Sequence, residues 1–556
     1  MHHVEIFVLV AGAVAVTALC RRWGWPSPLV LVAVGLAVSF VPGVPRYEVD
    51  PELVLEFVLP PLLYSAATES SYQDVRRYVG PILRLGVGLV LVSAFAVALV
   101  VWLLVEDLPF AVALVLGAVV APPDAVAAAA VGRRLGLPRR VMSMLSGESL
   151  INDATSLTLY KVALAAVATG TAAFSGGAGV FALAVVVGVA LGLGLGVLVH
   201  RVRMRLDDPV VASAVGLLTP FAAYWSAEAL SGSGVLAVVA AGLYLGHTAP
   251  RAGFATRLFQ TPLWSTLVLP LEAFTFALIG LQLPWLIDDV RRSHEGLASA
   301  ALVALAVLGT ALLVRPLYVL ATGHVRRRRH AGAPGERPAD LLTARESAVV
   351  SWAGMRGVVT LAAAAAVPAE VDGEEFPYRA SLQLVAYAVA IGTLLLQGLT
   401  LPWVIRRLGV GSQEEAARDA TQEAQVRVAT ASAVRRVLEQ RTPEWARELG
   451  DEQAARLVQR LVGATTARAQ AAAAMIDPEG GTQRGEDGDG APGRLVPAPL
   501  AGRRGQQLRR DLVRAQREVL VERRDAGALD ETVMRRVLRE LDLEDEALAA
   551  SWVNRV

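Results

Sequence analysis

Residues 110–131 read FAVALVLGAVVAPPDAVAAAAV, an apolar run long enough to cross a lipid bilayer but interrupted by two prolines and an aspartate. Pro122 and Pro123 lack backbone N–H donors and clash with preceding carbonyl groups, so we expect the helix to break before Asp124. A broken helix inside a membrane is tolerated only where its exposed backbone groups line a cavity or are buried in protein. This stretch therefore predicts a membrane protein whose helices are interrupted around a polar site.

The chain divides into an apolar part and a polar tail. Of its 103 charged residues, 48 lie in residues 412–556 and 55 in the first 411 positions. The apolar part contains thirteen runs of bilayer-spanning length, which predict an all-α polytopic membrane protein with about 13 transmembrane helices. The runs lie near 4–20, 27–43, 52–70, 80–105, 109–131, 141–169, 178–200, 209–230, 233–248, 260–286, 297–323, 345–367 and 380–405.

Charge and cysteine usage exclude several classes of partner. The formal net charge of +1 creates no field that favours nucleic acid, and we expect no nucleic-acid partner. The single cysteine, Cys20, excludes an intramolecular disulfide and a cysteine metal cluster.

Loop arginines predict the orientation of the spans. Loops on one side of the membrane carry 21 arginines and loops on the other side carry 4. Because basic loops stay in the cytoplasm, we expect the N-terminus outside and the tail inside. The first run has no basic start and is followed by Arg21 and Arg22, so we interpret it as a retained span rather than a signal peptide.

Composition predicts four segments. Residues 1–410 form the transmembrane domain, 411–475 a cytosolic helical segment, 476–502 a flexible linker rich in Gly, Asp and Pro, and 503–556 a second cytosolic helical segment. Two interpretations of the tail remain open: a solvated helical extension that helps assembly, and a regulatory module.

A second polar stretch, SGESLIND at 146–153, lies in the sixth run. Helical spacing places Glu148 with Asn152 on one face and Ser149 with Asp153 on another. An ionisable residue near mid-membrane is costly unless it is paired or hydrated, so Asp153 is a functional candidate. Carboxylates together with the carbonyl oxygens of a broken helix suit a hard cation such as sodium.

The twelfth run carries GMRG at 354–357, whose glycines loosen the helix around Arg356. Arg356 is the deepest arginine of the apolar part by position, and we expect it to pair with Glu148, which leaves Asp153 free for an ion. Arg84 and Arg315 lie nearer the inner ends of their runs, and we expect both to snorkel. For the weaker candidates we favour a polar contact between helices or a place at the membrane interface; these are Glu56, Glu69, Lys161, Glu272 and Gln282.

Together these motifs resemble the sodium/proton antiporter family, in the branch of bacterial antiporters and animal sodium/proton exchangers. The similar segments are LPPLLY at 59–64, APPDA at 121–125, GESLIND at 147–153, FALIGL at 276–281 and GMRG at 354–357. The resemblance implies inverted repeats with broken helices in spans 5 and 12, a homodimer, and a place in the bacterial inner (plasma) membrane.

The resemblance also implies the activity: secondary transport that exchanges sodium, lithium or potassium for protons, in the service of pH and sodium homeostasis. It implies no enzyme, no catalytic residue and no cofactor; the partners are the cation, the proton, the lipid bilayer and a second copy. The Asn152-Asp153 pair is similar to the electroneutral branch of the family.

Carried over residue by residue, the resemblance gives each polar group a role. Asp153 would bind the cation or the proton, and sodium would lie at Asp124, Ser149 and Asp153, with the carbonyl of Pro123 as a further ligand. The organising residues of the site would be Glu148, Asn152 and Arg356.

One departure and three alternatives remain open. The family often has threonine where this chain has Pro123 and proline where it has Ala125, which leaves the ion preference unsettled. A channel or uniporter could use the same oxygen-lined site, and a membrane sensor could use the tail as its output. An enzyme is the least favoured, since we find no set of nucleophile, base and orienting group.

Overall fold

The computed structural model of the chain is α-helical in nearly all the residues it describes. The described residues are 2–42, 44, 53–169, 172–293, 296–330, 342–371, 373–411, 413–456, 458–459, 462–463 and 503–553. The predicted linker at 476–502 lies outside them. The two described strands, β1 (Glu370–Val371) and β2 (Glu374–Glu375), form a short antiparallel pair.

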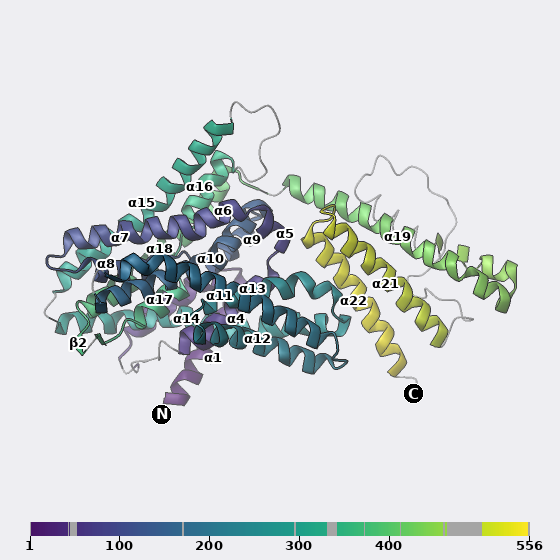
Figure 1. Cartoon of the computed structure of the whole chain (residues 1–556), viewed down its shortest axis with the longest axis horizontal. Helices are drawn as coiled ribbons and strands as arrows, with labels where there is room; N and C mark the ends of the chain where they lie inside the picture. Colours follow the sequence, from purple (N-terminus) through teal and green to yellow (C-terminus); the bar gives the residue numbers. More distant parts are fainter. Residues whose placement is uncertain are drawn as a thin grey trace. The chain divides into compact units, whose positions relative to one another are not determined.

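The chain forms two compact units. One comprises Met1–Thr248 and Pro262–Gly411, and the other comprises Ala249–Thr261 and Ser412–Val556. The first holds the apolar runs, and every one of the thirteen predicted spans corresponds to one helix or to consecutive helical segments (Figure 1).

The spans differ in whether they are continuous. The continuous helices are α1 (His2–Trp23), α2 (Ser27–Ser39), α10 (Arg139–Thr169), α11 (Ala172–Arg203), α12 (Pro209–Ala229), α13 (Gly234–Thr248), α14 (Phe254–Arg292), α15 (Leu297–His330) and α18 (Arg379–Leu408). The segmented spans are η1 (Val54–Val58) with α4 (Leu59–Glu69), α6 (Val79–Leu83) with η2 (Arg84–Leu89) and α7 (Val90–Leu104), α8 (Phe110–Val120) with α9 (Ala125–Leu135), and α16 (Ala344–Trp352) with α17 (Val358–Ala365). Two short helices connect spans: α5 (Tyr72–Arg77) and η3 (Ala249–Arg251).

Seven helices of the described chain are long and apolar enough to cross a membrane by length and composition alone. The other spans do not meet these criteria for three reasons. Helix α2 is short, α10 is polar, and the spans α8–α9 and α16–α17 are broken. The breaks in spans 5 and 12 fall where the prolines and glycines predicted them. The departures from a simple membrane helix therefore gather in the spans that carry the polar motifs.

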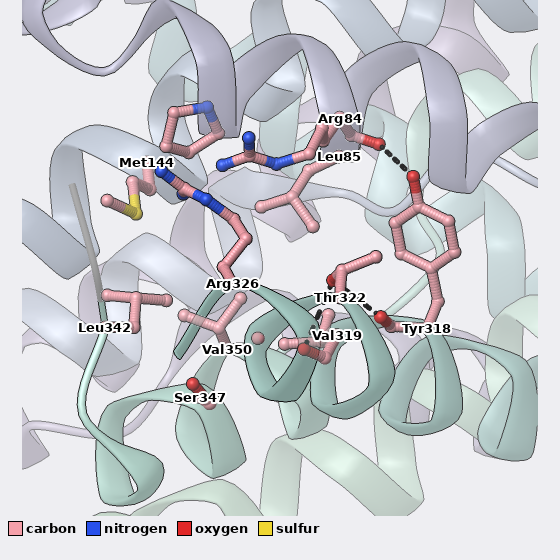
Figure 2. A pocket seen from close by; sticks show the side chains of 12 residues that line it. Arg84, Leu85, Met144, Tyr318, Val319, Thr322, Arg326, Leu342, Ser347 and Val350 are labelled. Atoms are coloured by element: carbon pink, nitrogen blue, oxygen red, sulfur yellow. Dashed lines mark hydrogen bonds between the residues drawn. The ribbon is translucent and has the colours of Figure 1, made fainter. Parts of the chain in front are cut away.

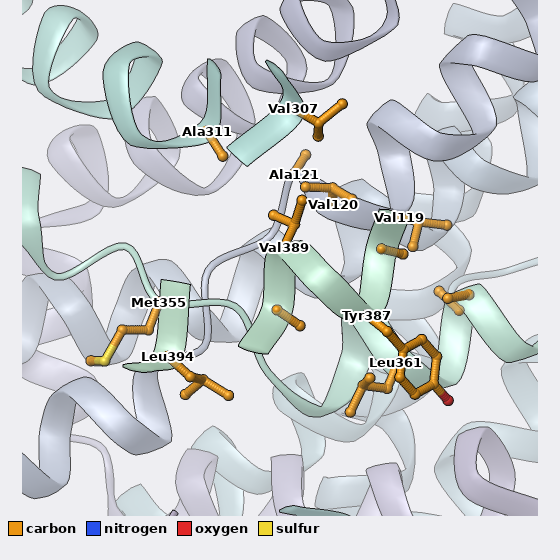
Figure 3. Close-up of a cluster of buried hydrophobic side chains, with 14 of the residues drawn as sticks. Val119, Val120, Ala121, Val307, Ala311, Met355, Leu361, Tyr387, Val389 and Leu394 are labelled. Carbon is orange, nitrogen blue, oxygen red and sulfur yellow. The ribbon is translucent and has the colours of Figure 1, made fainter. Parts of the chain in front are cut away.

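A buried aliphatic cluster surrounds the two breaks (Figure 3). Its members near the breaks are Val119, Val120 and Ala121 at the end of α8, Met355 between α16 and α17, and Val389 and Leu394 on α18. Close packing of this kind leaves few voids and holds an irregular backbone in a single arrangement. The interruptions are thus part of a packed core.

The second unit packs three tail helices around apolar side chains. These helices are α19 (Gln413–Leu449), α21 (Arg503–Asp525) and α22 (Glu531–Val553), and their shared core includes Leu520, Val533 and Met534. Ion pairs complete the unit: Nε of Arg257 donates to Asp542 at 2.8 Å, and Arg517 donates to Asp545 at 2.6 Å. The segment 249–261 is in this way held by the tail helices.

Candidate functional site

The two broken spans meet at their unwound segments. Helix α8 ends at Val120 and α9 begins at Ala125, while α16 ends at Trp352 and α17 begins at Val358. The backbone N–H of Asp124 donates to the carbonyl of Met355 at 2.6 Å. This hydrogen bond satisfies two groups that the breaks remove from the helices, and it ties one interruption to the other.

Gly357 makes room for the carboxylate of Asp124. A methyl group added at Gly357 would overlap the Asp124 side chain, so a residue with Cβ cannot stand there without displacing it. Gly357 is also the N-cap residue of α17, where the N–H groups of a helix start carry partial positive charge. The sequence explained this glycine by its effect on the helix, and the structure adds that it shapes the space around Asp124.

Helix α10 turns its polar face toward the broken span α8–α9. The side-chain amide of Asn152 donates to the carbonyl of Pro123 at 2.6 Å, and the hydroxyl of Ser156 donates to the carbonyl of Ala118 at 2.8 Å. Both acceptors lie on the chain just before Asp124. Asn152 is fully buried, and its Oδ1 atom accepts no hydrogen bond from a described residue.

Asp153 is a buried carboxylate that has no ion pair and no hydrogen bond with any described residue, although its residue is only 6% exposed. Its electrostatic neighbour is Asp124, which carries the same charge. Ser149 lies one turn earlier on α10 and is half-buried. A charged carboxylate in such a place is costly without a cation or a proton, so these oxygens together favour a positively charged ligand.

Glu148 pairs with Arg315, and the expectation that it pairs with Arg356 is wrong. The guanidinium group of Arg315 donates to both carboxylate oxygens of Glu148, one of them at 2.7 Å, and its Nε donates to the carbonyl of Val350 at 2.9 Å. Both charged side chains are 2% exposed. A bidentate pair of this kind is strong and directional, and it joins α10, α15 and α16.

Arg315 does not snorkel, because Glu148 and the carbonyl of Val350 hold its guanidinium group inside the protein. Gly354 provides the space, since a Cβ there would lie 2.5 Å from Cδ of Arg315. Gly354 is therefore the sequence signal that points to Arg315, although it stands next to Arg356 in the GMRG motif.

Arg356 lies between α16 and α17, in the segment that crosses Asp124. It is 2% exposed, and its backbone N–H donates to Oγ1 of Thr393 at 3.0 Å. Its guanidinium group makes no hydrogen bond to a described residue, and its Nε atom is buried without a partner. Its charged neighbours are Arg315 and Glu148, so Arg356 lies near that ion pair without being hydrogen-bonded to it.

Known proteins with similar sequences indicate the function of this chain. Residues 7–407 match the family described as "Sodium/hydrogen exchanger, transmembrane". The chain belongs to this family. The exchanger is therefore a membrane transporter and not an enzyme, and sodium/proton exchange is its activity.

Individual relatives agree with the family. An uncharacterized Na⁺/H⁺ exchanger of Mycobacterium tuberculosis is 35% identical over 412 residues, which cover 72% of the exchanger and 74% of the relative. An Na⁺/H⁺ antiporter of Aphanothece halophytica is 29% identical, covering 69% and 70%. A sodium, potassium, lithium and rubidium/H⁺ antiporter of Bacillus subtilis is also 29% identical, covering 68% and 57%.

The fold has a solved counterpart. The sodium proton antiporter MjNhaP1 of Methanocaldococcus jannaschii, solved at pH 8, superposes with a TM-score of 0.55 and 20% identity, covering 74% of the exchanger and 99% of that chain. At this identity the likeness concerns the fold alone.

Three of the weaker candidates for a functional role in the spans make polar contacts between helices. Lys161 pairs with Glu228 at 2.5 Å, Glu56 accepts from Nε1 of Trp225 at 3.1 Å, and Gln282 accepts from the hydroxyl of Tyr387. These contacts join elements that are far apart in sequence. They support the interpretation of these three residues as polar links in the scaffold.

Proposed function

We propose that Asp153 is the group that binds either a sodium ion or a proton, and that exchange results from this competition. The observation that carries the proposal is the burial of the Asp153 carboxylate without an ion pair or a hydrogen bond from any described residue. An empty, charged carboxylate is disfavoured in a low-dielectric interior. The site therefore moves across the membrane loaded, with a cation in one direction and a proton in the other.

Sodium has oxygen ligands available around Asp153. We propose that it is held by Asp124, Ser149 and Asp153, with the carbonyl of Pro123 as a further ligand. Hard oxygen donors of this kind suit a hard monovalent cation. The carbonyl of Pro123 already accepts one hydrogen bond from Asn152, and a carbonyl oxygen has a second lone pair for an ion.

The organising residues hold this geometry. Asn152 fixes the carbonyl of Pro123, and Glu148 anchors α10 to α15 through Arg315. We propose that Arg356 organises the site from the segment between α16 and α17, where Oγ1 of Thr393 accepts the hydrogen bond from its backbone N–H. In this proposal Glu148 and Arg356 act on the ion through their positions and do not bind it.

The wider setting follows from the sequence and the family. We propose a homodimer in the bacterial plasma membrane, with the N-terminus outside, the tail in the cytoplasm and a role in pH and sodium homeostasis. The transport domain would occupy residues 1–410, followed by helical segments at 411–475 and 503–556 that flank the linker at 476–502. One carboxylate that carries one charge at a time favours an exchange of one cation for one proton.

The test uses the purified exchanger in liposomes with a pH-sensitive dye inside. A sodium gradient should drive proton movement in the wild type, and Asp153→Asn should reduce it to the level of protein-free liposomes. Asp207→Asn is the matched control, because Asp207 is exposed on the connection between α11 and α12 and should leave the rate unchanged. Full exchange by Asp153→Asn would overturn the proposal.

Two extensions of the same assay settle the finer points. Replacing sodium by lithium, potassium or rubidium gives the ion preference, which the departure at Pro123 leaves open. Clamping the membrane potential with potassium and valinomycin tests the stoichiometry. One-for-one exchange predicts a rate that does not depend on the potential, and a rate that follows the potential would contradict it.

A further inference from the structure

A pocket of about 50 Å³ lies in the membrane unit among α6, η2, α10, α15 and α16 (Figure 2). None of the proposed ion ligands lines it. A cavity needs a volume of roughly 10–15 Å³ to hold one water molecule, so this pocket has room for a group of several atoms. It is therefore a second site, distinct from the place where the broken spans cross.

The pocket is positively charged. Arg84 and Arg326 are half-buried, and their guanidinium groups converge at one end of the pocket (Figure 2). None of the residues that line the pocket is acidic. Both arginines also interact with other groups of the chain, and both bring positive charge to the pocket. Guanidinium groups bind phosphate through paired N–H donors.

The surroundings of the pocket are apolar. Met144 and Val350 line it. Leu83, which directly precedes Arg84, is 47% exposed, and Leu317, on the same helix as Arg326, is 66% exposed. In a membrane protein, exposed leucines of this kind face acyl chains. Arg326 begins the basic run 326–329, which lies at the cytoplasmic surface in the proposed orientation. The combination of an anion site with neighbouring lipid-facing leucines fits a phospholipid.

We propose that this pocket binds the phosphate of an anionic phospholipid from the cytoplasmic leaflet. The proposal rests on the orientation given under the proposed function. Juxtamembrane arginines attract anionic lipids, and each contributes enough to change the affinity roughly fivefold. The ligand is recognised by its negative phosphate and by acyl chains that lie along the leucines.

The pocket also reaches the residues that hold the ion site together. Val350 lines the pocket, while its carbonyl oxygen accepts the hydrogen bond from Nε of Arg315. Met144 lies on α10 one turn before Glu148, the partner of Arg315. A lipid in the pocket thus contacts the helices joined by the Glu148–Arg315 pair, and we expect it to stabilise their arrangement and to raise the exchange rate.

The first experiment measures thermal unfolding of the purified exchanger in detergent with added phosphatidylglycerol, phosphatidylcholine or inorganic phosphate. Phosphatidylglycerol should raise the unfolding temperature, and the other two additives should not. Arg84→Gln and Arg326→Gln should each weaken the apparent affinity for phosphatidylglycerol roughly fivefold, and the double variant roughly 30-fold. Arg328→Gln is the matched control, since it removes the same charge from an exposed position on the same helix.

A double Arg84→Lys, Arg326→Lys variant guards against a fold defect, because it keeps both charges and should keep most of the stabilisation. Equal stabilisation of the wild type and the double glutamine variant by phosphatidylglycerol would overturn the proposal. If inorganic phosphate alone stabilises the wild type and the double glutamine variant loses this effect, the pocket binds a free anion. That result would overturn the proposal of a phospholipid ligand.

The second experiment measures exchange in phosphatidylcholine liposomes with and without phosphatidylglycerol. The wild type should be faster with the anionic lipid, and the double glutamine variant should not respond. Asp153→Asn separates this proposal from the proposed function, because it should lose exchange and still be stabilised by phosphatidylglycerol. Loss of the lipid effect in Asp153→Asn would contradict an independent pocket.

Discussion

Two carboxylates on one helix, five positions apart, have opposite environments. Glu148 is buried and held by both ends of the Arg315 guanidinium, whereas Asp153 is buried with no ion pair or hydrogen bond from the described chain. The first charge is compensated permanently by the protein. The second needs a ligand that can come and go.

This difference separates structure from transport. Removing one partner from a buried ion pair leaves an uncompensated charge, which costs about 3–5 kcal/mol. Removing a buried carboxylate that has no partner removes the free-energy cost of burying its charge. The position of a charge in the membrane is therefore a weaker guide to its role than the presence of a fixed counter-charge.

The largest expected effect comes from breaking the pair. Arg315→Gln should lower the free energy of unfolding by about 3–5 kcal/mol, because Glu148 stays buried without its partner. Unfolding in mixed micelles with increasing SDS measures the change. Arg356→Gln is the matched control: Arg356 is equally buried but has no hydrogen-bonded carboxylate, so its replacement should cost less. Equal losses in both variants would contradict the assignment of Arg315 as the partner of Glu148.

The next effect concerns the space beside Asp124. Gly357→Ala puts a methyl group where the Asp124 carboxylate lies, and overpacking of this kind costs about 1–3 kcal/mol. If that cost falls on the ion site, the sodium concentration for half-maximal exchange should rise roughly 5- to 150-fold. The exchange assay over a series of sodium concentrations measures it.

Gly309→Ala is the control for that substitution. Gly309 lies on α15 and has no atom within 4 Å of an added Cβ, so alanine should be tolerated there. An unchanged sodium response in Gly357→Ala would show that the carboxylate of Asp124 has room to move. It would then weaken the case for Asp124 as a ligand.

The breaks of spans 5 and 12 were predictable because their causes are local. Two consecutive prolines remove donors at fixed positions, and glycines lower the cost of irregular backbone. The burial of Asp153 was predictable for a similar reason, since its place in an apolar run fixes its depth. Patterns confined to one run thus led to the correct elements.

The partner of Glu148 was not predictable because it depends on packing among three helices. Arg84, Arg315 and Arg356 all lie within apolar runs, and only the packing shows that Arg315 reaches Glu148 and that Gly354 leaves room for it. A pair whose members lie 167 positions apart leaves no pattern within a single run.

A smaller effect is expected when the unpaired carboxylate itself is removed. Asp153→Asn should leave the free energy of unfolding unchanged or raise it by about 1–3 kcal/mol at neutral pH, since a neutral amide is less costly to bury than an unpaired charge. The same SDS titration measures it. The variant should also lose any stabilisation by sodium that the wild type shows. A strong loss of stability would place Asp153 with Glu148 as a structural group.

The tail also contains a carboxylate held by arginines, but this group is more exposed to solvent. Its loss should therefore have the smallest effect on stability. Glu423 on α19 accepts hydrogen bonds from Arg427 at 2.7 Å and from Arg536 of α22 at 3.0 Å. Partial burial raises the pKa of Glu423, but these two arginines outweigh it and hold the pKa below its usual range. These contacts therefore contribute stability at neutral pH, and the contribution is lost as the pH falls through the lowered folded-state pKa of Glu423.

Hydrogen exchange of α19 and α22 in the full chain, corrected for intrinsic rates, measures this loss between pH 7 and pH 3.5. Glu423→Gln should remove the acid-dependent part of the protection. Glu439→Gln is the matched control, because the Arg435–Glu439 pair is more than half exposed and should contribute under about 1 kcal/mol. If Glu423→Gln leaves the acid response intact, then a second charge links α19 to α22. If it removes the response, the half-buried contacts of Glu423 stabilise the tail more than the exposed Arg435–Glu439 pair does, and Asp153 contrasts with Glu423 as a carboxylate buried without such partners.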